Sequence, residues 1–494
     1  MLIFRKKRWL ELVNNQNKTP LFDAIKEYHK KQVIPFDVPG HKHGKGIPEL
    51  AEFVGNKVLE IDVNSMKPLD NIGSPCGVIK EAEELMADAY CSDHAFFLVN
   101  GTSSGVQAMI MSVCNPGEKI IMPRNAHKSA INGLILSGAV PVYIQPETND
   151  RLGIAMGVSV ESVEKAIAKN PDVKAVFLIN PTYYGATTDL REIIKMAHKH
   201  GMAVIVDEAH GAHLGFHEEL PPGAMELGAD MAAVSLHKTG GSLTQSSVLL
   251  LNEGFVDRNH VRTILNLTQT TSASYLLMAS LDIARKMLIT RGNEVFSEIL
   301  RLTRMAREEI NKIDGLYAFG KELVGVEGVF DFDETKLGIN VSGLGITGFR
   351  AYDILRDEYN IQVELGDVFN ILAIVSVGDD KSSIRALIDA LRDMSQKYKG
   401  GEMKFANVNL ENPEVIVSPR DAFYASKKLI KLEDAEGEIS GESIMAYPPG
   451  IPIVTPGERI SEEMINYIRY IKTQHSMLTD TEDPHVDYIK VLGI

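Results

Sequence analysis

Ala203-Val204-Ile205-Val206-Asp207-Glu208-Ala209-His210 is the first of two stretches that decide the fold, and the second is Met231-Ala232-Ala233-Val234-Ser235-Leu236-His237-Lys238. Each stretch begins with an apolar run and ends in polar side chains. A parallel strand that is buried on both faces is typically such a run. Ligands of open α/β sheets bind just beyond the carboxyl ends of the strands. We therefore expect Asp207 and Lys238 to reach the same edge of one sheet.

Strand-like and helix-like segments alternate around these two stretches. Strands are predicted at residues 95–99, 119–122, 140–144, 175–179, 203–206 and 231–234. Helices are predicted at residues 78–90, 103–113, 127–136, 160–168 and 190–200. This alternation predicts a mainly parallel sheet with helices on both faces, which places the chain in the α/β class.

The rest of the 494-residue chain divides into smaller parts. A short amphipathic helix is predicted at residues 20–32, and long helical stretches at 275–288 and 293–313 lead out of the large domain. A strand at 336–342, a helix at 347–358 and a strand at 371–376 predict a small α+β domain. We therefore predict an N-terminal arm and helix at 1–45, a large domain at 46–290, a small domain at 291–400 and a C-terminal domain at 401–494.

Composition and charge narrow the classes of function. The net charge of -15 and the pI of about 5.5 argue against a nucleic-acid-binding surface and are compatible with a cationic substrate. No apolar run reaches the roughly 20 residues that span a bilayer, and the basic N-terminus lacks the features of a secretory signal. Cys76, Cys91 and Cys114 form no CxxC pair, which is typical of reduced thiols. We predict a cytoplasmic protein without nucleic-acid or membrane partners.

Lys238 and Asp207 together predict a cofactor. A partly desolvated lysine at the edge of a sheet, followed by Thr239-Gly240-Gly241-Ser242, is a candidate Schiff-base amine. An aspartate on a neighbouring strand is the group that keeps the ring nitrogen of pyridoxal 5′-phosphate protonated, and it must stay ionised to do so. The alternative for Lys238 is a surface lysine after a strand. The pair predicts a pyridoxal-phosphate enzyme that acts on amino acids.

Residues after two other predicted strands would complete this site. Asn100-Gly101-Thr102-Ser103-Ser104-Gly105 opens a helix, where backbone N–H groups and hydroxyls can cradle a phosphate. An ordinary helix N-cap is the alternative. His127 follows the strand at 119–122, and its ring could stack on a flat cofactor or bond to the backbone at a helix start. The hydroxyl-rich segment 268–272 could cap the next helix or supply phosphate donors across a subunit boundary.

Asp207 could instead be a helix N-cap or a metal ligand. His210 and His213 lie nearby at three-residue spacing, but no HExxH motif or carboxylate triad completes a metal site. We therefore predict no metal. If the extended conformation persists beyond Asp207, Ala209 shares its face of the strand, and its methyl group could pack under the cofactor ring.

In combination, the motifs of this chain resemble those of the bacterial Orn/Lys/Arg decarboxylases, which are fold-type I pyridoxal-phosphate enzymes. The resemblance covers nearly the whole chain from about residue 19, and it is greatest to the shorter, Bacillus-type arginine decarboxylases. The chain lacks room for the N-terminal wing domain of the longer members. The matching motifs are Phe36-Asp37-Val38-Pro39-Gly40-His41-Lys42, Asn100-Gly101-Thr102-Ser103, Arg124-Asn125-Ala126-His127-Lys128-Ser129, Asp207-Glu208-Ala209-His210, Ser235-Leu236-His237-Lys238, Pro419-Arg420-Asp421-Ala422-Phe423, Tyr447-Pro448-Pro449-Gly450-Ile451-Pro452 and Pro456-Gly457-Glu458.

The resemblance implies how the cofactor is held. Lys238 would carry the cofactor through its ε-amine, and Asp207 would hold the pyridine nitrogen. His127 would stack on the ring, and Ala209 would pack against the other side of the ring. The implied phosphate ligands are Thr102, Ser103, Ser235, His237 and, from a second subunit, Thr271.

The resemblance also implies the reaction. A basic amino acid would lose its α-carboxylate as CO2, and Lys238 or His237 would then return a proton to Cα. Glu364 matches an acidic position near the distal cation of the substrate. His210 stands where longer members commonly carry tryptophan, and we assign it to substrate binding. L-Arginine, which gives agmatine for polyamine biosynthesis, is favoured over lysine and ornithine.

Two other functions remain open at this point. An aminotransferase on the same fold would need an arginine to clamp the substrate carboxylate, and Arg350 or Arg420 could serve. An inactive regulatory relative could bind a polyamine or a partner enzyme, although the intact Asp207 and Lys238 argue against it. Because the site draws residues from two chains, we predict a homodimer or a higher homo-oligomer with shared active sites.

Overall fold

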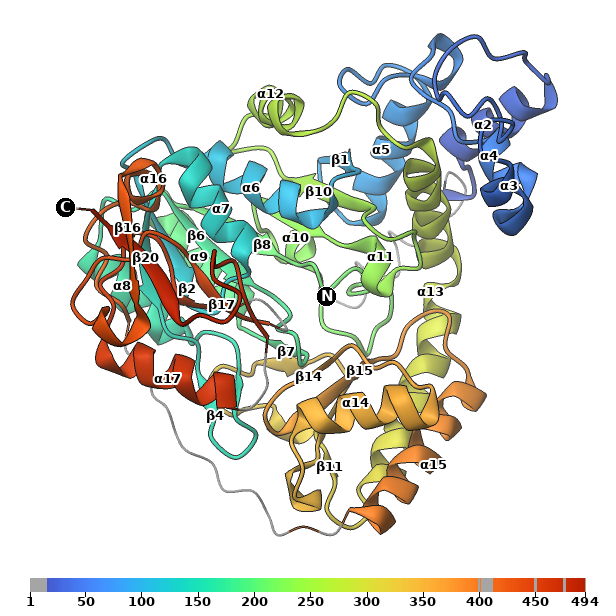
Figure 1. Cartoon of the computed structure of the whole chain (residues 1–494). Coiled ribbons are helices and arrows are strands. Elements are labelled where there is room, and N and C mark those ends of the chain that lie inside the picture. The colour runs from blue at the N-terminus through green and yellow to red at the C-terminus, as the bar shows by residue number, and fades with distance from the viewer. Residues whose placement is uncertain (1–15, 399, 401–411, 448–450, 474–476, 494) are drawn as a thin grey trace. The chain divides into compact units, whose positions relative to one another are not determined.

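The structure is a computed structural model, and it describes residues 16–398, 400, 412–447, 451–473 and 477–493 (Figure 1). The predicted N-terminal arm and parts of the polar linker near residue 400 and of the Tyr447-Pro452 turn lie outside these residues. The chain forms two compact units. Unit 1 consists of Met1–Met109, Glu208–Glu218 and Pro222–Phe296, and unit 2 consists of Ile110–Asp207, Glu219–Pro221 and Ser297–Ile494.

Unit 1 contains three antiparallel strands in the order β1 (His94–Leu98), β10 (Ser247–Leu251) and β9 (Met231–Val234). β1 and β9 lie where the sequence predicts strands, but each pairs antiparallel with β10. β10 is not among the predicted strands, although Val248-Leu249-Leu250-Leu251 is apolar and buried. An antiparallel strand needs no crossover helix, so the alternation of helices and strands gives no signal for it.

The helices of unit 1 begin at signals that the sequence carries. α2 starts at Pro20, where a missing N–H donor costs nothing, and the Asp282 carboxylate accepts the N–H groups of Leu21 and Phe22. The side chain of Asp257 caps α12 by accepting the N–H of His260. The helices are α2 (Pro20–Lys30), α3 (Pro48–Val54), α4 (Asn56–Glu60), η1 (Lys67–Leu69), α5 (Val78–Ala89), α6 (Gly101–Val113), α10 (Ala224–Leu227), α11 (Leu236–Thr239) and α12 (Arg258–Thr268).

One helix, α13 (Tyr275–Ile310), covers the long helical stretch predicted from residue 275 to 288 and its continuation at 293–313. Gly292 lies within this helix. A Cβ atom at Gly292 would lie 3.0 Å from Cβ of Phe216, so the glycine permits close packing without breaking the helix. Tertiary packing therefore overrides the local helix penalty of glycine.

Unit 2 contains parallel strands in the order β8 (Ala203–Asp207), β6 (Ala175–Ile179), β2 (Lys119–Pro123) and β3 (Val140–Ile144). β8 and most of β6 are buried, as their apolar sequences predict. α7 (Lys128–Ser137), α8 (Val160–Lys169) and α9 (Leu190–Lys199) follow β2, β3 and β6 along the chain, and α8 and α9 pack side by side. The predicted α/β class is confirmed by these parallel strands and their helices.

A second sheet of unit 2 has the order β11 (Tyr317–Ala318), β13 (Lys336–Asn340), β15 (Asn370–Ile374) and β14 (Leu365–Gly366). Its helix α14 (Gly348–Tyr359) matches the helix predicted at 347–358. α15 (Lys381–Lys397), which is not predicted, begins with a capping box at Asp380 and Ser383. The remaining short elements here are β4 (Thr148–Asn149), β5 (Ile154–Ala155), β7 (Ala186–Thr187), β12 (Asp331–Phe332), η2 (Lys321–Leu323) and η3 (Ser342–Leu344).

The C-terminal part of unit 2 has its own apolar core. Ile444, Val454, Ile468, Ile489 and other apolar side chains form this cluster. β16 pairs with β20, and β17 pairs with both β18 and β19. The elements are α16 (Pro419–Tyr424), β16 (Lys427–Lys431), η4 (Leu432–Asp434), β17 (Ile444–Tyr447), β18 (Ile451–Val454), α17 (Glu462–Thr473), β19 (Met477–Thr479) and β20 (Tyr488–Leu492).

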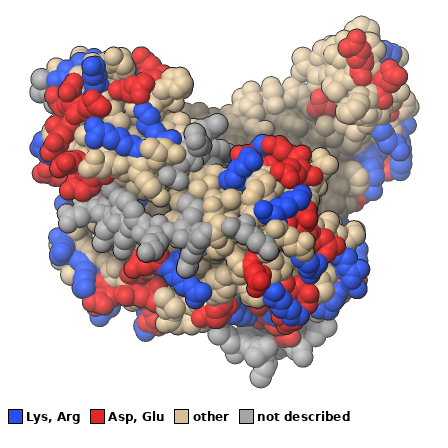
Figure 2. Space-filling view, turned by 60° about the horizontal axis from the view of Figure 1, so that its bottom comes forward, with Lys and Arg blue, Asp and Glu red and all other residues tan. Residues whose placement is uncertain are grey.

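The surface carries both signs of charge. Figure 2 shows acidic and basic side chains interspersed over the face that it presents. On this face, the basic side chains do not gather into the stripe that nucleic-acid-binding surfaces use. Among the described residues, no helix is long and apolar enough to cross a membrane.

Candidate active site

A cluster of buried hydroxyl groups lies beside the start of α6. The Thr102 and Ser235 hydroxyls are hydrogen-bonded to each other, and Thr102 Oγ1 donates to Ser247 Oγ over 2.9 Å. All three residues are buried. These side chains come from α6, from the end of β9 and from the start of β10, so the antiparallel order of unit 1 brings them together.

The N-terminus of α6 is held close to the strands of unit 1. Gly101 begins the helix with φ of +73°, a conformation that glycine adopts without strain. A Cβ atom at Gly105 would lie 2.8 Å from Leu98 Cδ1 and 3.2 Å from Ala233 Cβ, so only glycine allows this approach. The first N–H groups of such a helix, together with its dipole, favour an anion.

Lys238 lies in α11, the short helix after β9, and its Nζ atom is 2.8 Å from Nε2 of His210. Lys238 is partly buried, and His210 is buried. A lysine amine that donates to this nitrogen requires an imidazole with an unprotonated Nε2. The predicted Schiff-base lysine and the predicted substrate-binding histidine are therefore direct neighbours.

The turn that carries His210 is held firmly. The N–H of Glu208 donates to Ala233 of β9 over 3.0 Å, and the Tyr90 hydroxyl donates to the Ala212 carbonyl over 2.7 Å. His213 is fully buried, and its Nδ1 atom lies 3.0 Å from the Thr239 hydroxyl, next to Lys238 in the chain. These bonds fix the turn and α11 to each other within unit 1.

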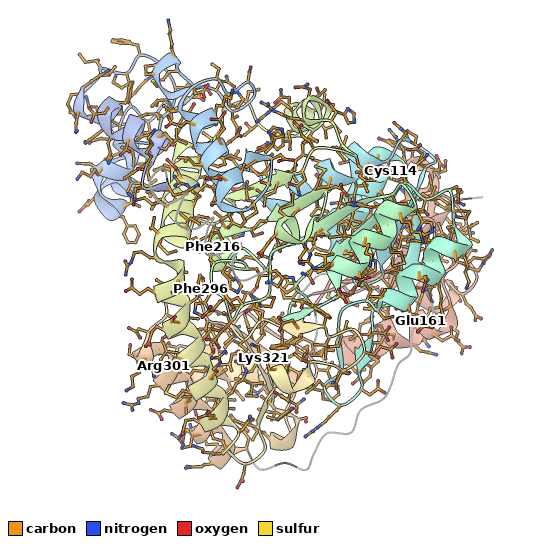
Figure 3. The ribbon with its side chains drawn as sticks, turned by 180° about the vertical axis from the view of Figure 1, so that it is seen from behind. Cys114, Glu161, Phe216, Phe296, Arg301 and Lys321 are labelled. Carbon is orange, nitrogen blue, oxygen red and sulfur yellow. The ribbon has the colours of Figure 1, made fainter. Side chains whose placement is uncertain are left out.

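The same turn packs against α13. The rings of His213 and Phe296 lie 5.4 Å apart, and Phe216 lies against Gly292. Phe216 and Phe296 are labelled in Figure 3. The turn is thus enclosed by both polar and apolar contacts, which limits the positions that His210 can adopt.

His237 lies beside the hydroxyl cluster along the chain, and its Nδ1 atom is 2.9 Å from the carbonyl oxygen of Ser246. A carbonyl only accepts, so Nδ1 carries the proton in this bond. Any role of His237 in binding phosphate or in moving a proton would therefore use Nε2.

Asp207 is the last residue of β8 and is buried in unit 2, and the chain continues from it into Glu208 of unit 1. The strand ends there. Ala209 lies in a turn closed by the N–H of Gly211 and the carbonyl of Glu208, 2.9 Å apart. The extended conformation does not persist beyond Asp207, because the Gly211 N–H donates back to the Glu208 carbonyl, so the condition under which Ala209 would share a strand face with Asp207 is not met.

His127 caps the N-terminus of α7 in unit 2. Its Nδ1 atom accepts the N–H of Ser129 over 3.2 Å and lies 2.9 Å from the Ser129 hydroxyl. Because a backbone N–H only donates, the proton of the neutral ring is on Nε2. The helix-start role that the sequence offers as an alternative is thus present, and it fixes the tautomer of the ring.

Glu364 precedes β14 in unit 2, and its side chain is exposed. Its N–H donates to the Leu372 carbonyl over 2.9 Å, which fixes the start of the β14–β15 hairpin. The partly buried Asp367 carboxylate accepts the N–H groups of Phe369 and Asn370 and the hydroxyl of Tyr184. Removal from solvent raises the pKa of the Asp367 carboxyl, and it also raises the pKa of the Tyr184 hydroxyl.

Several predicted residues differ in their surroundings. Ser103 and Thr271 are exposed, whereas Thr102 and Ser235 are buried.

Among the described residues, no group of three or more His, Cys, Asp or Glu side chains is arranged to hold a metal ion. Burial raises the pKa of Cys114 to about 12, so this thiol stays protonated at neutral pH.

Two features of the site region are missing from the sequence predictions. Ser247 completes the hydroxyl cluster, and the buried Arg124–Glu458 pair lies at the segment that carries His127. Ser247 opens the unpredicted strand β10. Arg124 and Glu458 lie within quoted motifs, but no pattern in the sequence pairs two residues that are 334 positions apart.

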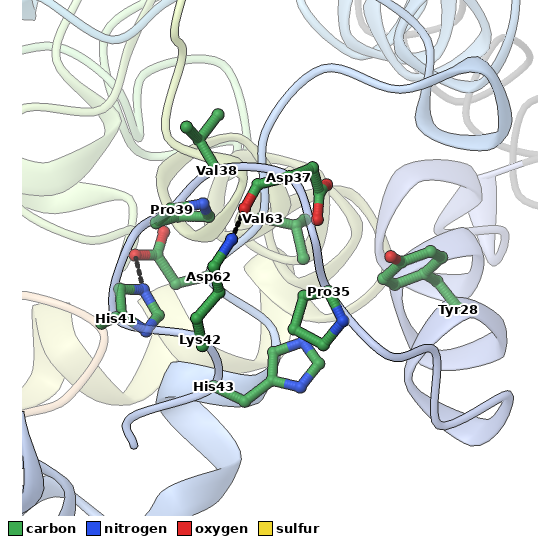
Figure 4. A pocket seen from close by; sticks show the side chains of 10 residues that line it. All are labelled: Tyr28, Pro35, Asp37, Val38, Pro39, His41, Lys42, His43, Asp62 and Val63. Carbon is green, nitrogen blue, oxygen red and sulfur yellow. Dashed lines mark hydrogen bonds and ion pairs between the residues drawn. The ribbon is translucent and has the colours of Figure 1, made fainter. Parts of the chain in front are cut away.

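The motif at residues 36–42 lines a small recess in unit 1 (Figure 4). His41 Nε2 lies 3.2 Å from the Asp62 carboxylate, and Lys42 donates to the Asp37 carbonyl. Lys42 and His43 both have positive φ, so this loop consists of tight turns. The recess is lined by Tyr28, Pro35, Asp37, Val38, Pro39, His41, Lys42, His43, Asp62 and Val63.

Comparison with known proteins identifies the family. Residues 19–383 match the Orn/Lys/Arg decarboxylase major domain, and residues 402–481 match the Orn/Lys/Arg decarboxylase C-terminal domain. The arginine decarboxylase of Bacillus anthracis is 48% identical over 92% of this chain and 93% of its own length. The arginine decarboxylase of Bacillus subtilis is 46% identical over 92% of this chain and 94% of its own length.

Solved structures show the same fold. The lysine decarboxylase of Francisella novicida superposes with a TM-score of 0.84 at 21% identity, covering 97% of this chain and 82% of that one. The constitutive lysine decarboxylase of Escherichia coli gives a TM-score of 0.80 at 20% identity over 96% of this chain and 82% of that one. The chain therefore belongs to the Orn/Lys/Arg decarboxylase family and is a decarboxylase.

Proposed function

We propose that this protein is a pyridoxal-phosphate-dependent decarboxylase that converts L-arginine to agmatine and CO2. The observation that carries the proposal is the 2.8 Å contact between Lys238 Nζ and His210 Nε2, in the same unit as a buried cluster of hydroxyl donors. The choice of arginine is supported by the two Bacillus relatives, which are named arginine decarboxylases and are 46% and 48% identical to this chain.

The chemistry of the donors in unit 1 fits pyridoxal phosphate. Thr102, Ser235 and Ser247 gather hydroxyls beside the start of α6, which suits a phosphate. Lys238 supplies the primary amine to which an aldehyde can be joined. His210 lies next to that amine and can accept a proton from it.

Each predicted residue has a part in the proposed site. When bound, pyridoxal phosphate supplies the sink for the electron pair released as the bond between Cα and the carboxylate carbon breaks. Asp207 keeps the ring nitrogen protonated, and His127 and Ala209 hold the ring. The phosphate is bound by Thr102, Ser103, Ser235, His237 and Thr271 of the partner subunit.

His210 controls the proton on Lys238 in this proposal. A lysine is nucleophilic only as the neutral amine, and its ordinary pKa of about 10.4 keeps it charged at pH 7. The hydrogen bond to His210 gives Lys238 an acceptor for one of its protons. The same pair can later return a proton to Cα, with His237 Nε2 as the second candidate donor.

The exposed carboxylate of Glu364 is the proposed partner of the distal guanidinium of arginine. The hairpin that presents it is fixed by the Asp367 network. A carboxylate can bind a guanidinium through two parallel hydrogen bonds, whereas an ammonium is a point charge. This geometry would favour arginine over lysine and ornithine.

The decisive assay supplies purified, cofactor-loaded protein with arginine, lysine and ornithine in parallel, and measures CO2 and the amine product. We expect agmatine formation with a kcat/KM about tenfold or more above that for the other two, the size of effect that distal recognition gives. Higher kcat/KM with lysine would overturn the choice of substrate. Keto-acid formation without CO2 would overturn the reaction class. Lys238→Ala is the matched inactive control.

We further propose that the protein is a homodimer. Unit 1 exposes a set of large apolar side chains, which we call the N-terminal apolar surface. Phe36 is 95% exposed and Phe53 90% exposed. Several large apolar side chains that are left exposed within one segment of the chain are typical of a surface that a partner covers. The members of this surface are Val33, Ile34, Phe36, Val38, Ile47, Leu50, Phe53, Val54 and Val58.

Leu267, a further exposed apolar residue, also supports a dimer. It lies near Thr271, the residue that is proposed to reach the active site of the other subunit. Leu267 in α12 is 74% exposed, four positions before the exposed Thr271. A partner chain that covers Leu267 would bring Thr271 to an interface, from which it could reach the phosphate of the other subunit.

A further inference from the structure

The segment that carries His127 is a short connection in unit 2. β2 ends at Pro123 and α7 begins at Lys128, so only residues 124–127 lie between a strand and a helix. The N–H of Arg124 donates to the Ile144 carbonyl over 2.9 Å, and His127 caps α7 through Ser129. The backbone is therefore fixed at both ends, and the side chain of Arg124 is the next constraint.

The side chain of Arg124 contacts the C-terminal part of the chain. Arg124 Nη1 lies 2.5 Å from Glu458 Oε1, and Nη2 lies 2.9 Å from Glu458 Oε2, which makes a bidentate pair. Nη2 also donates to the Ile453 carbonyl over 2.8 Å. The side chains are 9% and 1% exposed. Burial lowers the pKa of Arg124, but the charges of Glu458 and Tyr143 and their hydrogen bonds to the guanidinium together outweigh burial and raise that pKa.

Glu458 is itself held rigidly. Its Oε2 atom accepts the N–H of Thr455 over 2.7 Å. Gly457 has φ of +92°, and a Cβ atom there would lie 2.2 Å from the Val417 carbonyl oxygen, so the turn accepts no other residue. The carboxylate is therefore a fixed anchor and not a flexible surface group.

Weaker contacts surround this pair. Lys128 Nζ lies 3.1 Å from Asp480 Oδ1, and Arg420 Nη1 donates to the Ser137 carbonyl at the other end of α7 over 3.4 Å. The Lys128 and Asp480 side chains are 44% and 32% exposed, so solvent screens this pair. Among these contacts with the C-terminal part of the chain, the buried, bidentate Arg124–Glu458 pair is therefore the one that can fix the position of residues 124–127.

We propose that the Arg124–Glu458 pair is a brace through which the C-terminal domain positions His127 for stacking on the cofactor ring. The inference rests on the proposed function, because it assigns the stacking role to His127. It gives the C-terminal domain a part in the active site without any contact between that domain and the substrate. Arg124 and Glu458 are positioning residues that act through the backbone of residues 124–127.

The test removes both partners together. Arg124→Met with Glu458→Met replaces the pair by apolar side chains of similar size, and exchanges of this kind are often neutral for stability. We expect the double variant to fold with unchanged far-UV circular dichroism. Its dissociation constant for pyridoxal phosphate should rise about threefold to tenfold, the equivalent of one aromatic stacking contact. The induced circular dichroism of the bound cofactor should fall, and amide hydrogen exchange at 124–130 should become faster.

A mutant cycle separates positioning from general destabilisation. His127→Ala should weaken cofactor binding in the wild type, but it should add little in the double-methionine background, because the ring is already displaced. If the double variant does not fold, Glu458→Gln keeps the size and one acceptor of the side chain, and we expect the same changes to a smaller extent. The matched control is Arg459→Met with Glu414→Gln, an exposed pair at 2.9 Å in the same part of the chain, which should change nothing.

Two results would overturn the brace, and a third would overturn the proposed function. Wild-type cofactor affinity and wild-type amide exchange at 124–130 in the double variant would overturn the brace. Full additivity with His127→Ala would also overturn it, because it would show that the pair and the ring act independently. If the wild-type protein binds no pyridoxal phosphate, the proposed function fails, and exchange at 124–130 still shows whether the pair fixes this segment.

Discussion

At the scale of single residues, the side chains of the proposed site differ in what they act on. In the proposed function, Asp207 and Lys238 would act on the charge and the bonds that change during the reaction, whereas Thr102 and Ser235 would hold a phosphate whose charge stays constant. Only interactions that strengthen in the transition state accelerate the chemical step. Substitutions of the two kinds should therefore be separable by kinetics.

We expect Asp207→Asn to lower kcat by about 100-fold to 1000-fold, because the ring nitrogen loses the anion that keeps it protonated. Thr102→Val should instead weaken cofactor binding by about threefold to tenfold, the value of one buried hydrogen bond, with kcat little changed at saturating cofactor. Steady-state kinetics over a cofactor titration measures both. Equal losses of kcat in the two variants would contradict this division of roles.

Whether the position of a residue can be predicted from the sequence depends on whether a local pattern reveals it, or whether it is set by a contact with a residue far away in the chain. Lys238 and Asp207 are predictable because each follows a strand-like run, and strand ends are where such sites form. The contact of Lys238 with His210 could not be predicted from the sequence. It depends on the turn after β8, and hydrophobic periodicity does not reveal how a turn is shaped. The Arg124–Glu458 pair joins residues 334 positions apart, which no local pattern encodes.

At the scale of elements, the helix ends show how side chains fix local structure. The Asp70 carboxylate accepts the N–H groups of Asn71, Cys76, Gly77 and Ile79, and so caps α5 and closes the loop before it. Burial raises the pKa of Asp70, but these N–H groups together outweigh burial and hold the pKa below its usual value.

This cap predicts a pH-dependent stability difference. A carboxyl with a lowered pKa in the folded state stabilises the fold above its unfolded value of about 3.9, and this stabilisation is lost as the pH falls through the folded value. Asp70→Asn should therefore lower stability by about 1 to 2 kcal/mol at pH 7. Thermal unfolding of both proteins, followed from pH 7 down to pH 3, should show the difference shrinking below about pH 4. A difference that grows at low pH would refute this reading.

The elements of the parallel sheet could be predicted closely. β3 and β6 span the predicted residues, and β8 extends the prediction by one residue to Asp207. Short, continuous apolar runs that alternate with helix-like segments are typical of buried parallel strands, which explains this agreement. β10 could not be predicted in this way. The close packing of Gly292 in α13 against Phe216 could not be predicted either, because the two residues lie far apart in the sequence.

At the scale of the whole molecule, the proposed assembly depends on the N-terminal apolar surface. The net charge of -15 makes two copies of the chain repel each other, so a dimer has to gain its stability from burying apolar side chains such as Phe36 and Phe53. A second copy of the chain is the partner proposed above, and it would also supply Thr271 to the neighbouring site.

Phe36→Asp with Phe53→Asp should convert the dimer to monomers, because burying two carboxylates in an apolar interface is costly. Sedimentation velocity measures the change, and activity should fall with the loss of Thr271 from the partner subunit. Phe330→Asp, at a residue of unit 2 that is 60% exposed, is the control and should leave the dimer intact. A wild-type monomer with full activity would contradict the shared site.

The most direct test of the central claim is to map the lysine that carries the cofactor. The protein loaded with pyridoxal phosphate is reduced with sodium borohydride, digested, and analysed by mass spectrometry. The proposed function predicts the reduced cofactor on the ε-amine of Lys238, and Lys238→Ala should carry no label. A label on any other lysine, or an unlabelled wild-type protein, would contradict it.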